Sequence, residues 1–277
     1  MEQFHSSDIR NFAIVGHGAS GKTSLAEAFL KLGGEINRLG TIEDGSTVSD
    51  YHPAEKSRKI SIHSTPLHIE WENKKFNIID TPGYSDFIGE SLGSLGVVDL
   101  ALITIHASNG IEVCTETMWD NATKLGIPKM LVVNGLDREH TKFDEILTKV
   151  KKRFGENVFP MQIPVNPGPG YNQNVDVLRN ELITYKNDTS GEMEESALPE
   201  KYQKEVKNLH ESLIEYVAES DDDLLEKFFE KGGLTEEEMR EGIHKAIQDQ
   251  TFVPLFCTSA TSNIGVRRLC DFIAKYG

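Results

Sequence analysis

The chain has 277 residues and a formal net charge of −15, with 38% hydrophobic and 26% charged residues. This length supports a sizeable buried core, and no apolar run approaches the ~18 residues that a membrane span requires, which argues against a membrane protein. The three cysteines, Cys114, Cys257 and Cys270, are too few and too scattered for a disulfide framework or a zinc site, so we expect a reducing, cytoplasmic location.

Strands and helices alternate along most of the chain. In chain order, apolar or alternating runs predict strands at residues 11–17, a hairpin at 67–80, and further strands at 98–106, 128–135 and 251–260. Amphipathic spacing predicts the intervening helices at 20–32, 112–126, 142–155 and 265–277. This alternation predicts an α/β fold with a doubly wound, mostly parallel sheet.

A segment between residues 157 and 250 breaks this rhythm. It opens with a Pro-, Gly- and Asn-rich run, continues through a polar connector at 185–200, and ends in one long and two shorter helical stretches. We therefore expect a core formed by 1–156 and 251–277, with an inserted α+β subdomain at 157–250.

Most of the negative charge lies in the same part of the chain. Residues 181–250 contain 20 Asp and Glu against 8 Lys and Arg, whereas the other 207 residues carry 24 against 21. Nucleic acid requires clustered Lys and Arg, so we expect no direct DNA binding here. Either a solvated helical surface or a docking face for a basic protein partner accounts for this charge.

The stretch "GHGASGKT" at 16–23 fits the pattern G-x-x-x-x-G-K-[ST] in full, between an apolar strand and an amphipathic helix. In such a loop, glycines let backbone N–H groups wrap the phosphates of a nucleotide, and the helix N-terminus adds positive potential. Lys22 can reach the β- and γ-phosphates, and the Thr23 hydroxyl can coordinate Mg²⁺. We therefore predict nucleotide contacts from Gly16, His17, Gly18, Ala19, Ser20, Gly21, Lys22, Thr23 and Ser24.

The stretch "DTPGYSDF" at 80–87 directly follows the predicted strand "FNIID". An acid at the carboxyl end of a strand is well placed to hold Mg²⁺ through a water, and we assign this role to Asp80. Gly83 allows its N–H to approach the γ-phosphate closely. A plain turn would explain "DTPG" alone, but its pairing with the phosphate loop favours a nucleotide site.

Two further short patterns end predicted strands and point to guanine. In "NGLD", Asn134 and Asp137 follow "MLVV", and a carboxylate there can accept hydrogen bonds from N1–H and the amino group of guanine, which adenine does not offer. In "TSA", Ser259 and Ala260 can present a backbone N–H to the guanine carbonyl. Parallel strands bind ligands at their carboxyl ends, so these loops should meet the phosphate loop.

With these motifs in this order, the chain resembles translational GTPases, and most closely the N-terminal nucleotide domain of elongation factor G, over nearly all its length. The resemblance implies GTP and GDP as ligands, Mg²⁺, a monomer, and the ribosome as activator, including ribosomal RNA and stalk proteins. It also implies a role in translocation and further domains beyond residue 277, so we expect an excised nucleotide domain rather than the alternative, a stand-alone relative. Ser61, in "AEKSRKISIHS" (54–64), takes the position of a Thr that ligates Mg²⁺, so the predicted metal set is Thr23, Ser61 and Asp80.

Three departures from the family pattern concern catalysis and base binding. Tyr84 replaces a His that orients the attacking water, Ala19 replaces an Asp of the phosphate loop, and Gly135 replaces a Lys whose stem covers the nucleotide ring. The first two resemble a paralogous, elongation-factor-G-like branch.

The expected activity is that of a competent GTP binder and a slow GTPase, with Lys22, Gly83 and Tyr84 as the residues that act in hydrolysis. A different class of protein remains open, a ribosome-binding switch in which GTP occupancy matters and hydrolysis is dispensable. A small-molecule kinase with the same phosphate loop would need an acceptor site and no guanine-reading motif.

Overall fold

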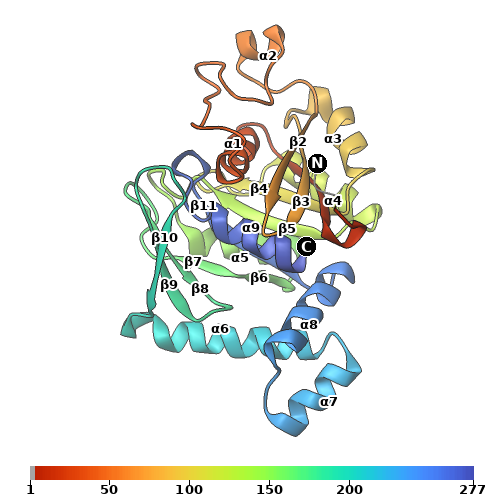
Figure 1. Cartoon of the computed structure of the whole chain (residues 1–277), viewed down its shortest axis with the longest axis vertical. Coiled ribbons are helices and arrows are strands. Elements are labelled where there is room, and N and C mark those ends of the chain that lie inside the picture. Colours follow the sequence, from red (N-terminus) through yellow and green to blue (C-terminus); the bar gives the residue numbers. More distant parts are fainter. Residues whose placement is uncertain (1–3) are drawn as a thin grey trace.

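The computed structural model describes residues 4–277, in which helices flank a large sheet and a smaller sheet lies beside it (Figure 1). The large sheet has seven strands in the order β2-β3-β1-β4-β5-β11-β6. Only the β2–β3 pair is antiparallel, and the other neighbours are parallel. The predicted α/β fold with a mostly parallel sheet is therefore confirmed. The strands are β1 (Ile9–Gly16), β2 (Thr65–Trp71), β3 (Lys74–Asp80), β4 (Leu100–His106), β5 (Lys129–Asn134), β6 (Val158–Pro160) and β11 (Val253–Thr258).

Alternating side chains of the central strands enter separate cores on the two faces of the sheet. In β1, Phe12 and Ile14 pack into one cluster with α1 (Lys22–Leu32) and α9 (Val266–Tyr276). Ala13 and Val15 pack into the other cluster, with α4 (Val113–Lys124) and α5 (Phe143–Phe154). Burial on both faces explains why these strands read as continuous apolar runs. It also fixes the edge at which their carboxyl ends meet.

The chain also forms two short helices that its periodicity does not predict. They are α2 (Pro53–Arg58), which projects away from the sheet, and α3 (Ile88–Leu95) (Figure 1). Three single turns of 3-10 helix complete the region, η1 (Ser6–Asp8), η2 (Ser85–Phe87) and η3 (Ala260–Ser262). In the part of the chain that the structure describes, no helix combines the length and apolar character needed to cross a membrane.

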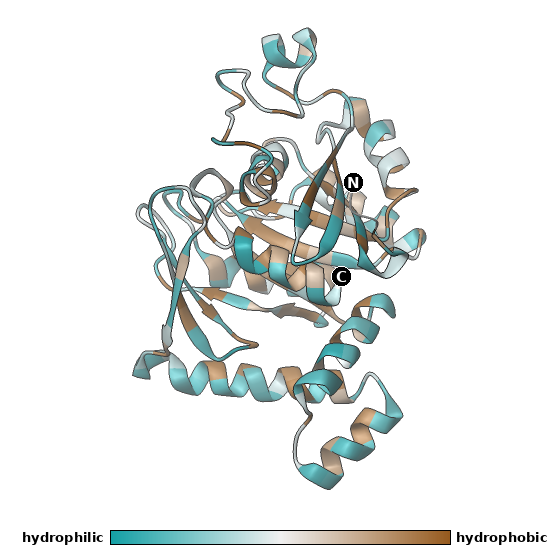
Figure 2. Cartoon of the chain, in the orientation of Figure 1, coloured by the Kyte–Doolittle hydropathy of each residue, from teal (hydrophilic) through white to brown (hydrophobic). Residues whose placement is uncertain are grey.

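The smaller sheet is antiparallel, in the order β10-β9-β8-β7. Its strands are β7 (Gln162–Pro164), β8 (Gln173–Asp176), β9 (Glu181–Tyr185) and β10 (Met193–Ala197). The helices α6 (Glu200–Ala218), α7 (Asp222–Lys231) and α8 (Glu236–Gln248) follow it. Figure 2 shows these helices mostly in hydrophilic colours, in contrast to the central strands of the large sheet.

The prediction of a polar connector at 185–200 is wrong, because β10 lies inside it. β10 is an edge strand whose residues are exposed or only half-buried, so its sequence lacks the apolar alternation of a strand. It forms through backbone pairing with β9. Within 157–250, β6 pairs with β11 in the large sheet, and β7–β10 form the small sheet. The division of the chain into a core and a subdomain inserted at 157–250 remains our proposal.

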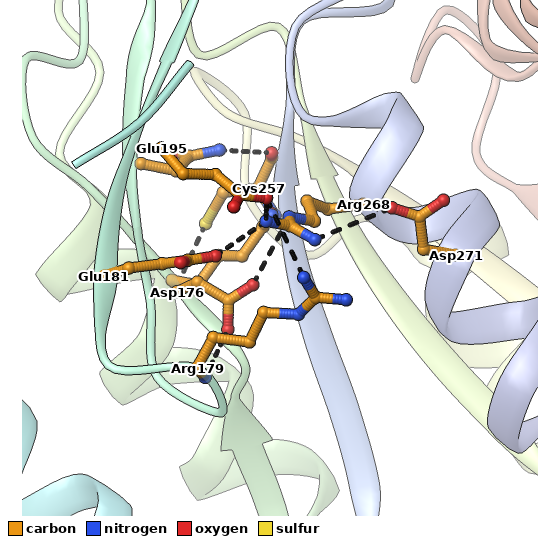
Figure 3. A network of polar contacts seen from close by, with 9 residues as sticks. Asp176, Arg179, Glu181, Glu195, Cys257, Arg268 and Asp271 are labelled. Carbon is orange, nitrogen blue, oxygen red and sulfur yellow. Dashed lines mark hydrogen bonds and ion pairs between the residues drawn. The ribbon is translucent and has the colours of Figure 1, made fainter. Parts of the chain in front are cut away.

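A buried arginine joins the small sheet to the last helix of the core (Figure 3). Arg268 of α9 is 4% exposed, and its guanidinium pairs with the carboxylates of Asp176, Glu181, Glu195 and Asp271. Burial raises the pKa of the Asp176 carboxyl, although Arg268 acts in the opposite direction. Removal of a single partner would leave an uncompensated buried charge. The network thus fixes the small sheet against α9, which begins just after β11.

Candidate nucleotide-binding site

Four loops meet at the carboxyl edge of the large sheet. They follow β1 (16–21), β3 (80–84), β5 (134–137) and β11 (258–264), which are parallel to one another within the sheet. This edge of an open α/β sheet is where ligands usually bind. The predicted site residues are therefore brought together by the topology of the sheet.

The loop after β1 requires glycine at two positions. Gly16 has φ +144°, and a Cβ there would lie 2.6 Å from the carbonyl oxygen of Thr104. Gly21 has φ +87°, and a Cβ there would lie 2.1 Å from Nδ2 of Asn134. Ser20 shares a hydrogen bond of 2.6 Å with the Thr104 hydroxyl, which ties the loop to β4. These contacts give the loop the turn that a phosphate cradle needs.

Lys22 begins α1 and is buried at the base of this loop, 5% exposed. Its Nζ donates a hydrogen bond of 2.7 Å to the carbonyl oxygen of His17. Burial lowers the pKa of the Lys22 ammonium to about 8, with Asp80 acting in the opposite direction. An anion beside Nζ would reverse this shift, because an opposite charge favours the protonated form. Phosphate binding by Lys22 remains a prediction that this buried ammonium is consistent with.

The predicted metal residues converge on one carboxylate. Oδ2 of Asp80 accepts hydrogen bonds from the hydroxyls of Thr23 (2.8 Å) and Ser49 (2.7 Å), and Thr23 Oγ1 lies 3.1 Å from the hydroxyl oxygen of Ser61. Within residues 4–277, Oδ1 of Asp80 is buried without a hydrogen-bond partner. Burial raises the pKa of Asp80 to about 6, against the lowering effect of the Ser49 and Thr23 hydrogen bonds.

This set fits Mg²⁺, which prefers oxygen ligands and is usually held by one or two carboxylates, waters and phosphate oxygens. Hydroxyl oxygens and a carboxylate oxygen without a partner are suitable donors. In the described part of the chain, no group of three or more His, Cys, Asp and Glu residues could hold a metal by itself. Waters or the oxygens of a bound phosphate would complete the shell of a cation here.

Ser49 and Asp50 are site residues that the sequence analysis missed. Asp50 is 4% exposed, and burial raises the pKa of its carboxyl, while a hydrogen bond from Ser61 acts in the opposite direction. Its Oδ2 has no hydrogen-bond partner among the residues that the structure describes. Both residues lie between predicted elements, in a stretch without periodicity, so only their polar, turn-like context hinted at a role.

Two buried glutamates hold the segment 40–64, which carries these residues. Glu27 of α1 accepts hydrogen bonds from the backbone N–H groups of Gly40 and Val48. Glu55 of α2, 1% exposed, accepts from the N–H groups of His52, Ile62 and His63. The carboxylates thus replace secondary structure as acceptors for a loop backbone. Ser61, next to Ile62, is placed toward Thr23 by this arrangement.

The side chain of Asn134 hydrogen-bonds to the loops after β1 and β11. Its Nδ2 donates to the carbonyl oxygen of Ser20 at 3.2 Å, and its Oδ1 accepts from the backbone N–H of Ala260 at 2.9 Å. The N–H of Ser259 donates to the carbonyl oxygen of Ile264 at 3.0 Å. These two amides are thus engaged within the protein, and their contact with a guanine carbonyl stays a prediction.

Asp137 has the environment expected of a base-reading carboxylate. Its Oδ1 is buried and lacks a hydrogen-bond partner within the described residues. Gly135, two residues before it, has φ +80°, and a Cβ there would lie 3.3 Å from Nε2 of His106. A lysine would be strained at that backbone conformation, so the local fold itself accounts for glycine at this position.

The remaining predicted residues lie at the phosphate end. His17 accepts a 3.4 Å hydrogen bond from the N–H of Cys114 through Nδ1, and its Nε2 lies 3.6 Å from Oε1 of Glu112. Ala19 is exposed and has φ +59°, a left-handed conformation that is costly for alanine. Ser24 is half-buried in the first turn of α1.

Tyr84 and Gly83 lie directly against the phosphate loop. Tyr84 is 40% exposed, and its ring covers Gly18, where a Cβ would lie 2.8 Å from the ring atoms Cε1 and Cζ. Gly83 contacts Lys22 and the backbone of His17 and Gly18. The aromatic ring thus packs on backbone beside the predicted γ-phosphate position.

Comparisons with known proteins relate the chain to a family and to a solved structure. The family model described as "Elongation factor Tu GTP binding domain" matches residues 7–277. The crystal structure of ttk003000868 from Thermus thermophilus is similar with a TM-score of 0.91 and 31% sequence identity, covering 98% of this chain and 41% of that one. The present chain therefore spans about two fifths of the length of this relative.

Proposed function

Because the chain belongs to the family of elongation factor Tu GTP-binding domains, and so is the GTP-binding domain of a translation factor, we propose that it acts within an elongation-factor-G-like protein. In this proposal it binds GTP and GDP with Mg²⁺, associates with the ribosome in the cytoplasm, and hydrolyses GTP slowly during translocation. The resemblance of Tyr84 and Ala19 to a paralogous branch supports this assignment.

One observation carries the binding half of the proposal. The Lys22 ammonium, whose pKa is lowered by burial, donates to the carbonyl oxygen of His17 and carries a charge that a phosphate would compensate. Within residues 4–277, Oδ1 of Asp80 and Oδ1 of Asp137 are buried without a hydrogen-bond partner. A phosphate, a hydrated cation and a guanine base would satisfy them in turn. Buried polar groups without partners are costly, so a functional ligand is the simplest explanation.

In the proposed reaction the protein mainly positions groups and stabilises charge. Lys22 and the loop amides hold the phosphates, and Thr23, Ser61 and Asp80 hold the cation, which neutralises charge developing on the phosphate oxygens. The N–H of Gly83 contributes a donor at the γ-phosphate. Tyr84 can donate one hydrogen bond to a water, but a phenol is a poor base near neutral pH.

The rate of hydrolysis is the part that Tyr84 and Ala19 affect. Loss of one group that stabilises the transition state costs about 10²–10³ in rate. The double variant Tyr84→His with Ala19→Asp should therefore raise ribosome-stimulated single-turnover hydrolysis by roughly 10²-fold. An unchanged rate in this variant would reject the assigned roles of both positions.

The second candidate is a switch in which GTP occupancy alone controls ribosome binding. The ring of Tyr84 packs against the backbone at Gly18. A packing role of this kind, without a role in hydrolysis, favours the switch. Release from ribosomes measured with GTP and with a non-hydrolysable analogue separates the two. Faster release with GTP supports hydrolysis as part of the cycle, whereas equal release supports the switch.

A further inference from the structure

The loop Gly83–Tyr84 fills the space beside the end of the phosphate loop. A Cβ on Gly83 would lie 2.2 Å from Nζ of Lys22 and 2.6 Å from the backbone nitrogen of Gly18. The Cα of Gly83 is therefore in van der Waals contact with both groups. Lys22 is a donor that a terminal phosphate would need, and a phosphate oxygen at a donor–oxygen distance of about 2.7–3.2 Å does not fit between its Nζ and Gly83.

The ring of Tyr84 closes the same space from the next position. It lies over Gly18, whose missing side chain permits the contact, because a Cβ would approach Cε1 and Cζ to 2.8 Å. Gly18 is buried although its neighbour Ala19 is exposed, so the ring is the cover at this point of the loop. Tyr84 and Gly18 thus form a complementary pair.

The two sides of this loop are anchored differently. Before it, the Thr81 hydroxyl donates to the carbonyl oxygen of Ile14 at 2.7 Å, and the Ser91 hydroxyl donates to that of Pro82 at 2.8 Å. After it, the N–H of Phe87 donates to the carbonyl oxygen of Tyr84 at 3.0 Å. Gly83 lies between these anchored residues, and none of these three hydrogen bonds involves its own backbone.

We propose that Tyr84 is a specificity-determining residue that disfavours a nucleoside triphosphate relative to the diphosphate, by holding Gly83 against Lys22 and Gly18. This rests on the proposed function. A diphosphate is held by the amides of the phosphate loop and by Lys22, and leaves the Tyr84–Gly18 contact intact. A third phosphate enters only when Gly83 and the ring move away, so its binding includes the loss of that contact.

The test measures the dissociation constants of GDP and of a non-hydrolysable GTP analogue, with Mg²⁺, for the wild-type protein and three variants. Tyr84→Ala removes the ring and should shift the affinity ratio toward the triphosphate by roughly fivefold, as expected for the loss of one partly exposed aromatic contact. Tyr84→Phe retains the ring and should keep the wild-type ratio. Phe229→Ala removes another exposed aromatic ring, on α7, and should also leave the ratio unchanged.

Two outcomes would overturn the proposal. A ratio in Tyr84→Ala within twofold of wild type would show that the ring does not discriminate, and an equal shift in Tyr84→Phe would assign the effect to the hydroxyl instead. Both leave the proposed function intact, because guanine nucleotides still bind. If the wild-type protein bound neither nucleotide, the proposed function itself would fail, and this inference with it.

Discussion

The phosphate loop (16–23) and the segment 40–64 meet at Thr23 and Ser61, but different contacts hold them. The loop depends on glycines at positive φ, where a Cβ would clash with Thr104 or with the side chain of Asn134. The segment is held by buried carboxylates that accept its backbone N–H groups, Glu27 from outside the segment and Glu55 from within it. The loop is thus fixed by the backbone conformation that its glycines permit, and the segment by side chains that replace secondary structure as acceptors.

The largest expected effect comes from a substitution in the phosphate loop. Gly21→Ala introduces a Cβ 2.1 Å from Nδ2 of Asn134 at a backbone with φ +87°, and should cost at least about 3 kcal/mol of unfolding free energy and abolish nucleotide binding. Gly34→Ala is the matched control. It has φ +78°, and no described atom lies within 4 Å of its Cβ position, so only strain of about 1 kcal/mol is expected. Equal losses in urea unfolding would contradict the role of the close contact.

The next effect concerns Asp80, which accepts hydrogen bonds from Thr23 of the phosphate loop and from Ser49 of the segment 40–64. Because the folded-state pKa of Asp80 is raised to about 6, the folded protein binds more protons than the unfolded chain between about pH 4 and 6. Its contribution to stability is therefore lost as pH rises through this window. Without nucleotide or Mg²⁺, Asp80→Asn should be more stable than wild type by about 2–3 kcal/mol at pH 7, and no more stable below pH 4.

Thermal unfolding of both proteins across this pH range provides the measurement. The difference between the variant and the wild type isolates Asp80 from the other carboxylates. A difference that does not change with pH would mean that Asp80 is not the titrating group.

The segment 40–64 should respond to loss of the buried acceptor Glu55. Glu55→Ala removes the buried carboxylate that accepts from His52, Ile62 and His63, and should cost about 2 kcal/mol, since three part-buried backbone N–H groups lose their acceptor. Amide hydrogen exchange should accelerate at Ile62 and His63 and stay unchanged in β5. Glu70→Ala, an exposed glutamate on β2, is the control and should leave these amides protected.

The smallest expected effect is a change in stability from a substitution in the phosphate loop. Ala19 has φ +59°, so Ala19→Gly relieves left-handed strain and should raise stability by about 0.5 kcal/mol after the entropy cost of glycine. The same substitution at Ala54, exposed in α2, should lower stability by about 1 kcal/mol. Calorimetric melting of both variants should therefore give shifts of opposite sign. Shifts of the same sign would show that Ala19 is not strained.

The same contrast explains what could be predicted from sequence. Continuous apolar runs predict β4, β5 and β11 because burial on both faces leaves no other composition, and the phosphate loop is recognisable because its glycines are required by geometry. The hairpin of β2 and β3 follows from alternation around the turn at Glu72 and Asn73.

The features that escaped prediction depend on contacts that the local sequence pattern does not reveal. β10 forms because β9 offers a backbone to pair with, and its own side chains carry no signal. Glu27, Asp50 and Glu55 look like ordinary surface acids in the sequence, and only the fold shows that they are buried. Asn134 was expected to face the base, but its amide also joins Ser20 to Ala260, a contact that no spacing rule encodes.

The central claim is tested most directly by calorimetric titration of the protein with GTP and with ATP. GTP should bind at least roughly 100-fold more tightly than ATP, and Asp137→Ala should remove most of this preference, because its carboxylate reads the base. Lys22→Ala should abolish binding of both, whereas Lys149→Ala, exposed on α5, should have no effect. Equal affinity for the two nucleotides, or binding that survives Lys22→Ala, would contradict the account.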